Sequence, residues 1–345
     1  MSVIPPPLPA LRKLTADQQS RPMLARDADS MYWMARYVER AEHIARLLLV
    51  NANVLVDVGD LAPEFLSGQW RSILEILNLP PLAEDPSDDD GPALAARVAR
   101  HLTFGGPDNP NSLVNCVTRA RENARAIREN ISAEMWESLN TLYWSLRGDD
   151  VPARFEESPE DVYRQVMVGS MLFQGLTDQT LPHEQPWLFT QLGKYLERTL
   201  ITARIIGARY ALLRRAEAWM EAPLRHIHWM AVLRSCCSLE AYRRLHVAET
   251  DPERVAAFVV LHGQNPRSVR FAVARAHEAI RCIHRDANPL STDPAERVLG
   301  RLTAALEYTD VPAAVSDTGL AALLASVQEH INDAAIAVQQ TYFLH

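Results

Sequence analysis

The chain has 345 residues, of which 48% are hydrophobic and 23% are charged, so it is long enough for one large domain or two and has ample apolar material for a core. Its formal net charge is −8 and its arginines are interleaved with acidic residues, which argues against a general nucleic-acid binder or a protein that docks on anionic membranes. Thirteen glycines are few for this length, and no apolar run approaches the roughly 20 residues that cross a bilayer, so the composition favours helix and predicts no membrane span.

The N-terminal residues and the cysteines indicate the cellular location of the protein. Residues 1–22 contain the proline-rich stretch from Ile4 to Pro9 and lack the apolar core of a signal peptide, so we expect them to form a disordered tail. The four cysteines are too few and too irregularly spaced for a disulfide framework or a CxxC metal site. Adjacent Cys236 and Cys237 are typical of core thiols in a reducing compartment, and we expect a cytoplasmic protein.

From Met23 onward the sequence predicts helices joined by short polar breaks, without a convincing alternating strand pattern. Caps, apolar spacing and prolines place them, in chain order, over residues 30–57, 63–77, 93–102, 113–131, 132–146, 160–177, 187–215, 224–245, 252–261, 266–285, 294–307 and 319–341. The segments 79–92 and 148–159 are short enough to be surface connectors rather than domain linkers. We therefore predict an all-α protein in which residues 23–345 form a single helical bundle-like domain.

The pattern Arg-(Ala/Thr)-x-x-x-(Ala/Ile)-Arg recurs four times within these helices. Its copies begin at Arg40, Arg119, Arg198 and Arg275, which lie 79, 79 and 77 residues apart. The first and third copies are the most alike, because Tyr-Val-Glu-Arg-Ala at 37–41 matches Tyr-Leu-Glu-Arg-Thr at 195–199. Related helices at even intervals predict a body built by internal repetition of Glu-Arg helices.

Helix geometry predicts how the Glu-Arg dipeptides find partners. Arg40 falls in the middle of an apolar stripe of its helix, so it should be buried at least along its stem and its guanidinium needs a partner. Glu39 points about 100° away from it, so the two neighbours should not pair with each other. We expect each arginine to reach the glutamate of the other repeat, Arg40 to Glu197 and Arg198 to Glu39.

Two interpretations of these charges remain open. They form either a buried ionic lock that fixes the register of two central helices, or a charged pocket that binds a carboxylate or phosphate ligand. Buried ion pairs are often structural, which favours the lock. The candidate residues for either role, which include the arginines that end the first and third motif copies, are Glu39, Arg40, Arg46, Glu197, Arg198 and Arg204.

Two polar segments are further candidates. Asn109, Asn111 and Ser112 precede the helix at residue 113, where side-chain oxygens and free backbone N–H groups are suited to an anion. Plain N-capping explains the same residues equally well and is the favoured interpretation. The segment 173–178 either ends a helix at its glycine or lines a cleft with its polar residues.

The sequence lacks the motifs of cofactor and metal chemistry. It has no glycine-rich phosphate loop, no G-x-S-x-G elbow and no H-E-x-x-H. Glu39-x-x-Glu42-His43 approaches a helical di-iron motif, which requires Glu-x-x-His on two facing helices. The matching region of the third copy offers Leu200 and Ile201 instead. We therefore predict that the protein uses no metal and no cofactor.

Segments in order from Met23 to Phe343 resemble the Alpha-E family, a bacterial all-helical family named for its Glu-Arg motif. The resemblance rests on residues 23–42, 108–112, 120–125, 132–137, 173–178, 192–198, 240–244, 266–271 and 306–310. Lys194 and Thr199 depart from the family pattern, because they stand where Arg and Ala are expected. The resemblance assigns no catalytic residue to this chain.

Members of this family look like partners of circularly permuted ATP-grasp proteins, encoded beside them or fused to them, often with a transglutaminase-like protein nearby. The resemblance therefore implies a role in peptide or amide-bond synthesis or processing, with the ATP-grasp partner supplying the nucleotide chemistry. We expect a non-catalytic helical subunit or scaffold of such a ligase. The alternative is an enzyme or small-molecule-binding protein that uses a charged Glu-Arg cleft between the repeat helices, and a third reading is a structural homo-oligomer.

Overall fold

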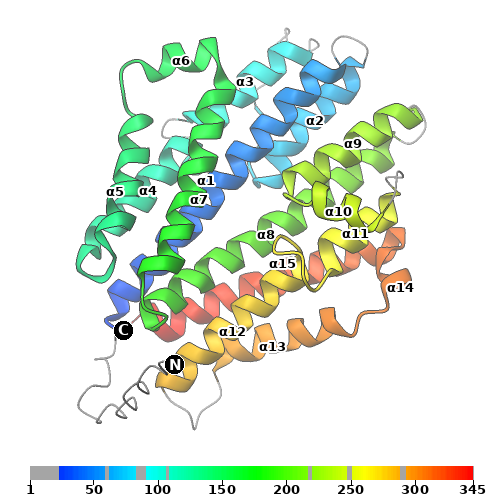
Figure 1. Ribbon diagram of the computed structural model, residues 1–345. Helices are drawn as coiled ribbons and strands as arrows, with labels where there is room; N and C mark the ends of the chain where they lie inside the picture. Colours follow the sequence, from blue (N-terminus) through cyan, green and yellow to red (C-terminus); the bar gives the residue numbers. More distant parts are fainter. Residues whose placement is uncertain are drawn as a thin grey trace, which may run out of the picture.

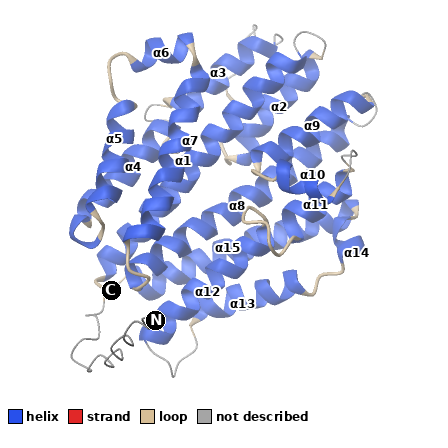
Figure 2. Cartoon of the chain, viewed as in Figure 1, coloured by secondary structure: helices blue, strands red, loops and turns tan. Residues whose placement is uncertain are grey.

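The computed structural model describes residues 23–58, 62–82, 91–105, 109–216, 220–246, 251–287 and 293–344 (Figure 1). The proline-rich tail expected at residues 1–22 lies outside them. The described part of the chain is built from helices and contains no strand (Figure 2), which confirms the all-α prediction. None of the described helices combines the length and the apolar composition that crossing a membrane requires.

Fifteen α-helices make up most of the described residues. They are α1 Ala25–Val58, α2 Pro63–Ile76, α3 Gly91–Thr103, α4 Leu113–Ala126, α5 Ala133–Ser145, α6 Val151–Glu157, α7 Pro159–Thr180, α8 Gln185–Ala216, α9 Ala222–Ser235, α10 Leu239–Leu245, α11 Pro252–Leu261, α12 Val269–Ala287, α13 Pro294–Glu307, α14 Val311–Val315 and α15 Asp317–Val338. A short 3-10 helix, Arg128–Asn130, follows α4, and a π-helical turn, Gln339–Phe343, follows α15.

Helix ends were predicted best where an aspartate precedes a proline. Helices α11 and α13 begin and end at the predicted residues. Asp251 caps α11 by accepting a hydrogen bond from the backbone of Glu253, and Asp293 accepts one from Glu296 at the start of α13. Each proline that follows lacks an N–H and has a fixed φ, so the helix start is set by local chemistry alone.

Several predicted boundaries were wrong. Gly175, which was expected to end a helix, lies within α7, and three further differences have a clear physical reason. The connector expected over 148–159 contains the short helix α6, which has Pro152 in its first turn and buries Val151 and Phe155. The single helix expected over 224–245 is split into α9 and α10, because Cys237 adopts a φ of 48° that no α-helix accommodates. The helix expected from Pro266 begins at Val269, because the serine before it is the cap.

The helices form two series that repeat the same order. Glu39 in α1 corresponds to Glu197 in α8, 158 positions later. Seven pairs of helices match in chain order, α1 with α8, α2 with α9, α3 with α11, α4 with α12, α5 with α13, α6 with α14 and α7 with α15. The predicted repetition is therefore a twofold duplication, in which motif copies one and three lie in α1 and α8, and copies two and four lie in α4 and α12.

Helices α1 and α8 pack against each other at the centre of the molecule (Figure 1). Residue numbers rise in the same direction along both helices, since Arg40 contacts Glu197 and Asn51, three turns later, contacts Arg209. The two helices therefore run parallel. On the outside, α4 and α7 cover α1, and their counterparts α12 and α15 cover α8.

One glycine permits the close approach of the central helices. A Cβ atom built on Gly193 of α8 would lie 2.3 Å from the backbone carbonyl oxygen of Tyr32 in α1. This is far inside van der Waals contact and involves backbone, which cannot turn aside as a side chain would. The distance between α1 and α8 is thus set by the absence of a side chain at Gly193.

The side of α1 that carries polar residues is buried as completely as its apolar side. Glu39, Glu42 and His43 are all at most 1% exposed. A charge removed from water must be paired or hydrogen-bonded within the protein. The partners of these side chains define the candidate site.

Candidate functional site

The two Glu-Arg dipeptides bind each other across the contact between α1 and α8. Arg40 donates from Nε to Glu197 Oε1 at 2.6 Å and from Nη2 to Oε2 at 3.0 Å. Arg198 repeats this geometry on Glu39, with 2.7 Å from Nε to Oε1 and 3.0 Å from Nη2 to Oε2. Both pairs are bidentate, which is the strongest arrangement of a guanidinium and a carboxylate. The reciprocal pairing predicted from helix geometry is confirmed.

Glu197 holds a second arginine that the sequence analysis missed. Arg36 Nε donates to Glu197 Oε2 at 2.8 Å, and its Nη1 donates to the hydroxyl of Tyr32 at 2.9 Å. Arg36 lies one turn before Arg40, so both side chains leave the same face of α1. This spacing of four residues was a signal that Arg36 belongs with Arg40.

Glu39 has further donors from outside α8. Arg267, in the turn before α12, places Nη1 3.2 Å from Glu39 Oε1 and 2.7 Å from Glu42 Oε2. Gln174 of α7 donates from Nε2 to Glu39 Oε2 at 2.7 Å. Glu42 also accepts a hydrogen bond from Arg46 Nε at 2.8 Å. Three carboxylates and five guanidinium groups thus tie α1, α7, α8 and the start of α12 together, and we call this set the Glu–Arg network.

The loop with Asn109, Asn111 and Ser112 meets the network at Arg40. Asn111 Oδ1 accepts a hydrogen bond from Arg40 Nη1 at 2.7 Å. Ser112 caps α4 by accepting from the backbone of Asn115, which confirms the capping interpretation. Anion binding by this loop stays a prediction, and Asn111 offers the network an acceptor oxygen rather than a donor.

A second copy of this loop supplies Arg267. The turn before α4 reads Asn-Pro-Asn-Ser at 109–112, and the turn before α12 reads Asn-Pro-Arg-Ser at 265–268. Ser268 caps α12 through a hydrogen bond of 3.1 Å to its Oγ, as Ser112 caps α4. The third residue of each turn contacts the central helices. The repeated Asn-Pro-x-Ser pattern was therefore the signal in the sequence that would have found Arg267.

The arginines that end the first and third motif copies, Arg46 and Arg204, have different surroundings. Arg46 pairs with Glu42, which precedes it by one helical turn. The residue one turn before Arg204 is Leu200, which offers no carboxylate. Arg204 forms no ion pair with any residue that the structure describes, and burial lowers the pKa of its guanidinium. The structure brings Arg46 into the network and leaves Arg204 outside it.

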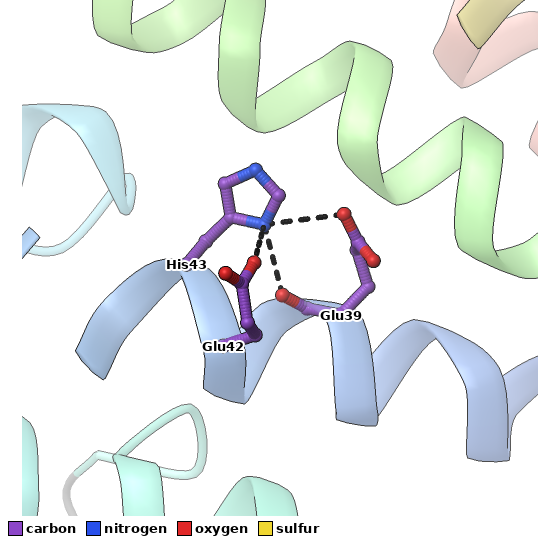
Figure 3. Close-up of side chains that lie close together, drawn as sticks. All are labelled: Glu39, Glu42 and His43. Atoms are coloured by element: carbon purple, nitrogen blue, oxygen red, sulfur yellow. Dashed lines mark hydrogen bonds and ion pairs between the residues drawn. The ribbon is translucent and has the colours of Figure 1, made fainter. Parts of the chain in front are cut away.

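Three potential metal ligands come together on α1 (Figure 3). One ligand atom each of Glu39, Glu42 and His43 lies within 4.8 Å of the others. Arg267 Nη1 contacts both carboxylates and lies 3.5 Å from His43 Nε2, so its guanidinium supplies the positive charge that a metal ion would bring. Burial lowers the pKa of His43, which favours its neutral form. That the protein uses no metal stays a prediction. The position of the Arg267 guanidinium among these three side chains supports it, because a metal ion there would meet a positive charge.

The arginines keep the buried glutamates ionised. Burial by itself raises the pKa of Glu197, but Arg40 and Arg36 outweigh it and hold that pKa at about 2. Burial likewise raises the pKa of Glu42, and Arg267 is the strongest of the groups that bring it down to about 2. Carboxylates with so low a pKa do not exchange protons near neutral pH, which makes them poor general acids or bases.

We expect acid to weaken the fold through this network. The pKa of Glu42 and of Glu197 is about 2 in the folded protein against an ordinary value of 4.5, and that of Glu39 is lowered as well. A lowered pKa stabilises the fold above pH 4.5, and this contribution is lost as the pH falls towards 2. Urea unfolding at several pH values should show the free energy of unfolding falling steadily below about pH 4.5. A flat profile over that range would contradict the assignment.

The sequence pattern of the Alpha-E family, described as a predicted alpha-helical domain with a conserved ER motif, matches residues 23–343. This is nearly the whole chain. The chain belongs to the Alpha-E family. In this Alpha-E protein the Glu-Arg dipeptides at 39–40 and 197–198 form the two reciprocal ion pairs at the centre of the fold.

The Alpha-E chain is similar to longer proteins of mycobacteria. An uncharacterised protein of Mycobacterium bovis and one of Mycobacterium tuberculosis are each 25% identical to it over 330 residues. The match covers 90% of this chain but 36% of each relative, so the chain spans little more than a third of their length. No solved structure matches it.

Proposed function

We propose that this Alpha-E protein is a non-catalytic helical subunit of a peptide- or amide-bond-forming system, and that it binds a circularly permuted ATP-grasp protein. The observation that carries the proposal is an apolar face of α7 that is open to solvent. The resemblance to the Alpha-E family suggests the partner. The paired state of the network carboxylates favours a structural role for the Glu-Arg motifs over a catalytic one.

Helix α7 presents apolar side chains to solvent at helical spacing. Val168 is 65% exposed, Met171 is 46% exposed and Leu172 is 53% exposed. Gly175, one turn further, has nothing within 4 Å of where a Cβ atom would lie. These residues stand three and four apart and so share one face, which we call the α7 face. A contiguous exposed apolar face of this kind is typical of a surface that binds another protein.

The duplicated helix shows that the fold does not require this face to be apolar. The positions of α15 that correspond to Val168, Met171 and Leu172 carry Ser326, Glu329 and His330. Both helices pack on the central helix of their own series. The same structural position is therefore polar in one series and apolar in the other, which supports the binding of a specific partner at the α7 face.

The length of the relatives agrees with a role in a larger assembly. In the mycobacterial relatives the part similar to this chain makes up 36% of the protein, so most of their length is further polypeptide. A domain that works joined to other polypeptide needs a surface that binds it, whether the partner is fused or separate. The transglutaminase-like protein implied by the family resemblance is a candidate for the same assembly.

The proposal is tested by affinity purification of the tagged chain from its own cells, with quantitative mass spectrometry of the proteins recovered. We expect a circularly permuted ATP-grasp protein in about one-to-one amount. Met171→Lys should reduce that recovery at least roughly tenfold, because a charge would be buried in the interface. The matched control is Glu329→Lys, which places the same lysine at the corresponding position of α15 and should leave recovery unchanged.

Other results would overturn the proposal. Recovery of the chain as a folded monomer without an ATP-grasp protein would contradict it. A homodimer that Met171→Lys dissociates, measured by light scattering, would assign the α7 face to a second copy of this chain instead. Equal loss of recovery with both lysine variants would show that the α7 face is not the binding surface.

A further inference from the structure

Lys194 lacks the ion pair that its counterpart in the first series makes. Lys194 in α8 corresponds to Arg36 in α1, 158 positions earlier, and Arg36 binds Glu197 at 2.8 Å. By the same relation Lys194 would bind Glu39. Yet no carboxylate of the described residues lies within 4.0 Å of its ammonium, which sits 4.7 Å from the centre of the Tyr195 ring. Lys194 is nonetheless only 7% exposed.

Glu39 is unavailable to Lys194 because its oxygens are already occupied. Its Oε1 accepts hydrogen bonds from Arg198 and Arg267, and its Oε2 accepts them from Arg198 and Gln174. Arg267 and Gln174 thus take the place that a fully symmetric arrangement would give to Lys194. The lysine is left as a buried cation without an anion among the described residues.

The second series also leaves space beside this lysine. Tyr32 and Trp33 of α1 correspond to Thr190 and Gln191 of α8, so two aromatic side chains are replaced by smaller polar ones. Thr190, Gln191 and Lys194 line a cavity together with residues of α1 and α7. Its free volume of about 10 Å³ is enough for one water-sized group, such as a single oxygen of a ligand.

A larger groove adjoins this cavity between α7, α8 and α12. The groove has a volume of about 430 Å³, and Gln191 lines both spaces. Its walls include the aromatic rings of Trp187 and Tyr195. Asp178 also lines the groove, and its Oδ1 accepts a hydrogen bond from Gln191 Nε2 at 3.0 Å. Gln191 is the side chain that the two spaces share, and a ligand that occupies both must displace it from Asp178.

Positive charge is in excess among the network, Lys194 and Asp178 taken together. The network has three carboxylates and five guanidinium groups, Lys194 adds a sixth cation, and Asp178 adds a fourth carboxylate. Burial and then Arg198 lower the pKa of Lys194 to about 8, while Asp178 and Glu39 raise it. The lysine is therefore mainly protonated at neutral pH. A buried excess of this kind is relieved by an anion.

We propose that Lys194 binds the carboxylate of a small-molecule or peptide ligand, with one carboxylate oxygen in the cavity and the body of the ligand in the adjoining groove. The ammonium donates a charge-assisted hydrogen bond to that oxygen. A carboxylate suits the cavity better than a phosphate, whose additional oxygens need more room. This binding site is independent of the proposed ATP-grasp partner, since all its residues belong to this chain.

The test is calorimetric titration of the purified chain with alanyl-alanine, with the same dipeptide amidated at its C-terminus, and with acetate. We expect alanyl-alanine to bind and the amide to bind at least roughly tenfold more weakly, because one charge-assisted hydrogen bond is lost. Lys194→Met should weaken binding by a similar factor, and Lys194→Arg should retain most of it. If acetate binds with the same affinity as the dipeptide, the site recognises the carboxylate alone. If acetate binds with lower affinity, the groove binds the rest of the peptide as well.

Stability separates this role from a structural one. Because Lys194 pairs with no carboxylate of the residues that the structure describes, Lys194→Met should leave the midpoint of urea unfolding unchanged or raise it. A lower midpoint would show that the lysine supports the fold and would overturn the proposal. Equal binding of the dipeptide and its amide, unchanged binding by Lys194→Met, or no binding of either carboxylate probe would overturn it too.

Discussion

Replacing Glu39 by glutamine should lower the free energy of unfolding by about 3–5 kcal/mol, as expected when one partner of a buried ion pair is removed. The substitution keeps the shape of the side chain but removes the charge that holds Arg198 and Arg267. Both guanidinium groups are buried, so neither can turn to water. Urea unfolding followed by circular dichroism measures the change directly.

An exposed ion pair supplies the matched control. Glu278→Gln makes the same chemical change in a pair with Arg275 whose side chains are about half exposed, and it should cost less than about 1 kcal/mol. The double variant Glu39→Gln with Arg198→Met should lose less stability than the sum of the two single changes, because the Arg198 guanidinium is no longer left buried without its carboxylate. A loss below about 1 kcal/mol for Glu39→Gln alone would show that the network is not a lock.

Gly193→Ala should destabilise the protein by about 3 kcal/mol, at the upper end of the cost of overpacking a core. The new Cβ atom would lie 2.3 Å from the backbone oxygen of Tyr32, so α1 and α8 must move apart. The ion pairs between Arg40, Arg198 and their glutamates span the same contact and would lengthen with it. Chemical denaturation gives the free energy, and near-ultraviolet circular dichroism reports the changed packing.

The control for this prediction is Gly175→Ala in α7. Nothing lies within 4 Å of the Cβ atom that this change would add. Alanine favours a helix over glycine, so the variant should be more stable by about 0.5–1 kcal/mol. If Gly193→Ala also raised stability, the two central helices would not be in contact there as described.

Local chemistry was sufficient to predict much of the fold. The starts of α11 and α13 depend on an aspartate cap and a proline within four residues of sequence, which act whatever surrounds them. The reciprocal pairing of Arg40 with Glu197 and of Arg198 with Glu39 followed from the angle between neighbouring residues on a helix, once the two copies were recognised as related. Helix α6 was missed although Pro152 lies in its first turn, because a helix of 7 residues is too short to show a periodic apolar pattern.

The sequence by itself determined that the chain is helical, that it contains related Glu-Arg helices, and that each dipeptide needs a partner in the other copy. Tertiary structure decided which other groups join them. Gln174 and Arg267 reach Glu39 from 135 and 228 residues away, and such distances leave no periodic signal within a helix. Because these two side chains occupy oxygens of Glu39, Lys194 does not pair with that carboxylate, although Arg36 at the corresponding position of α1 pairs with Glu197. Burial and exposure are properties of the packed molecule. The lysine that pairs with no described carboxylate and the exposed apolar face of α7 could therefore be found only in the tertiary structure.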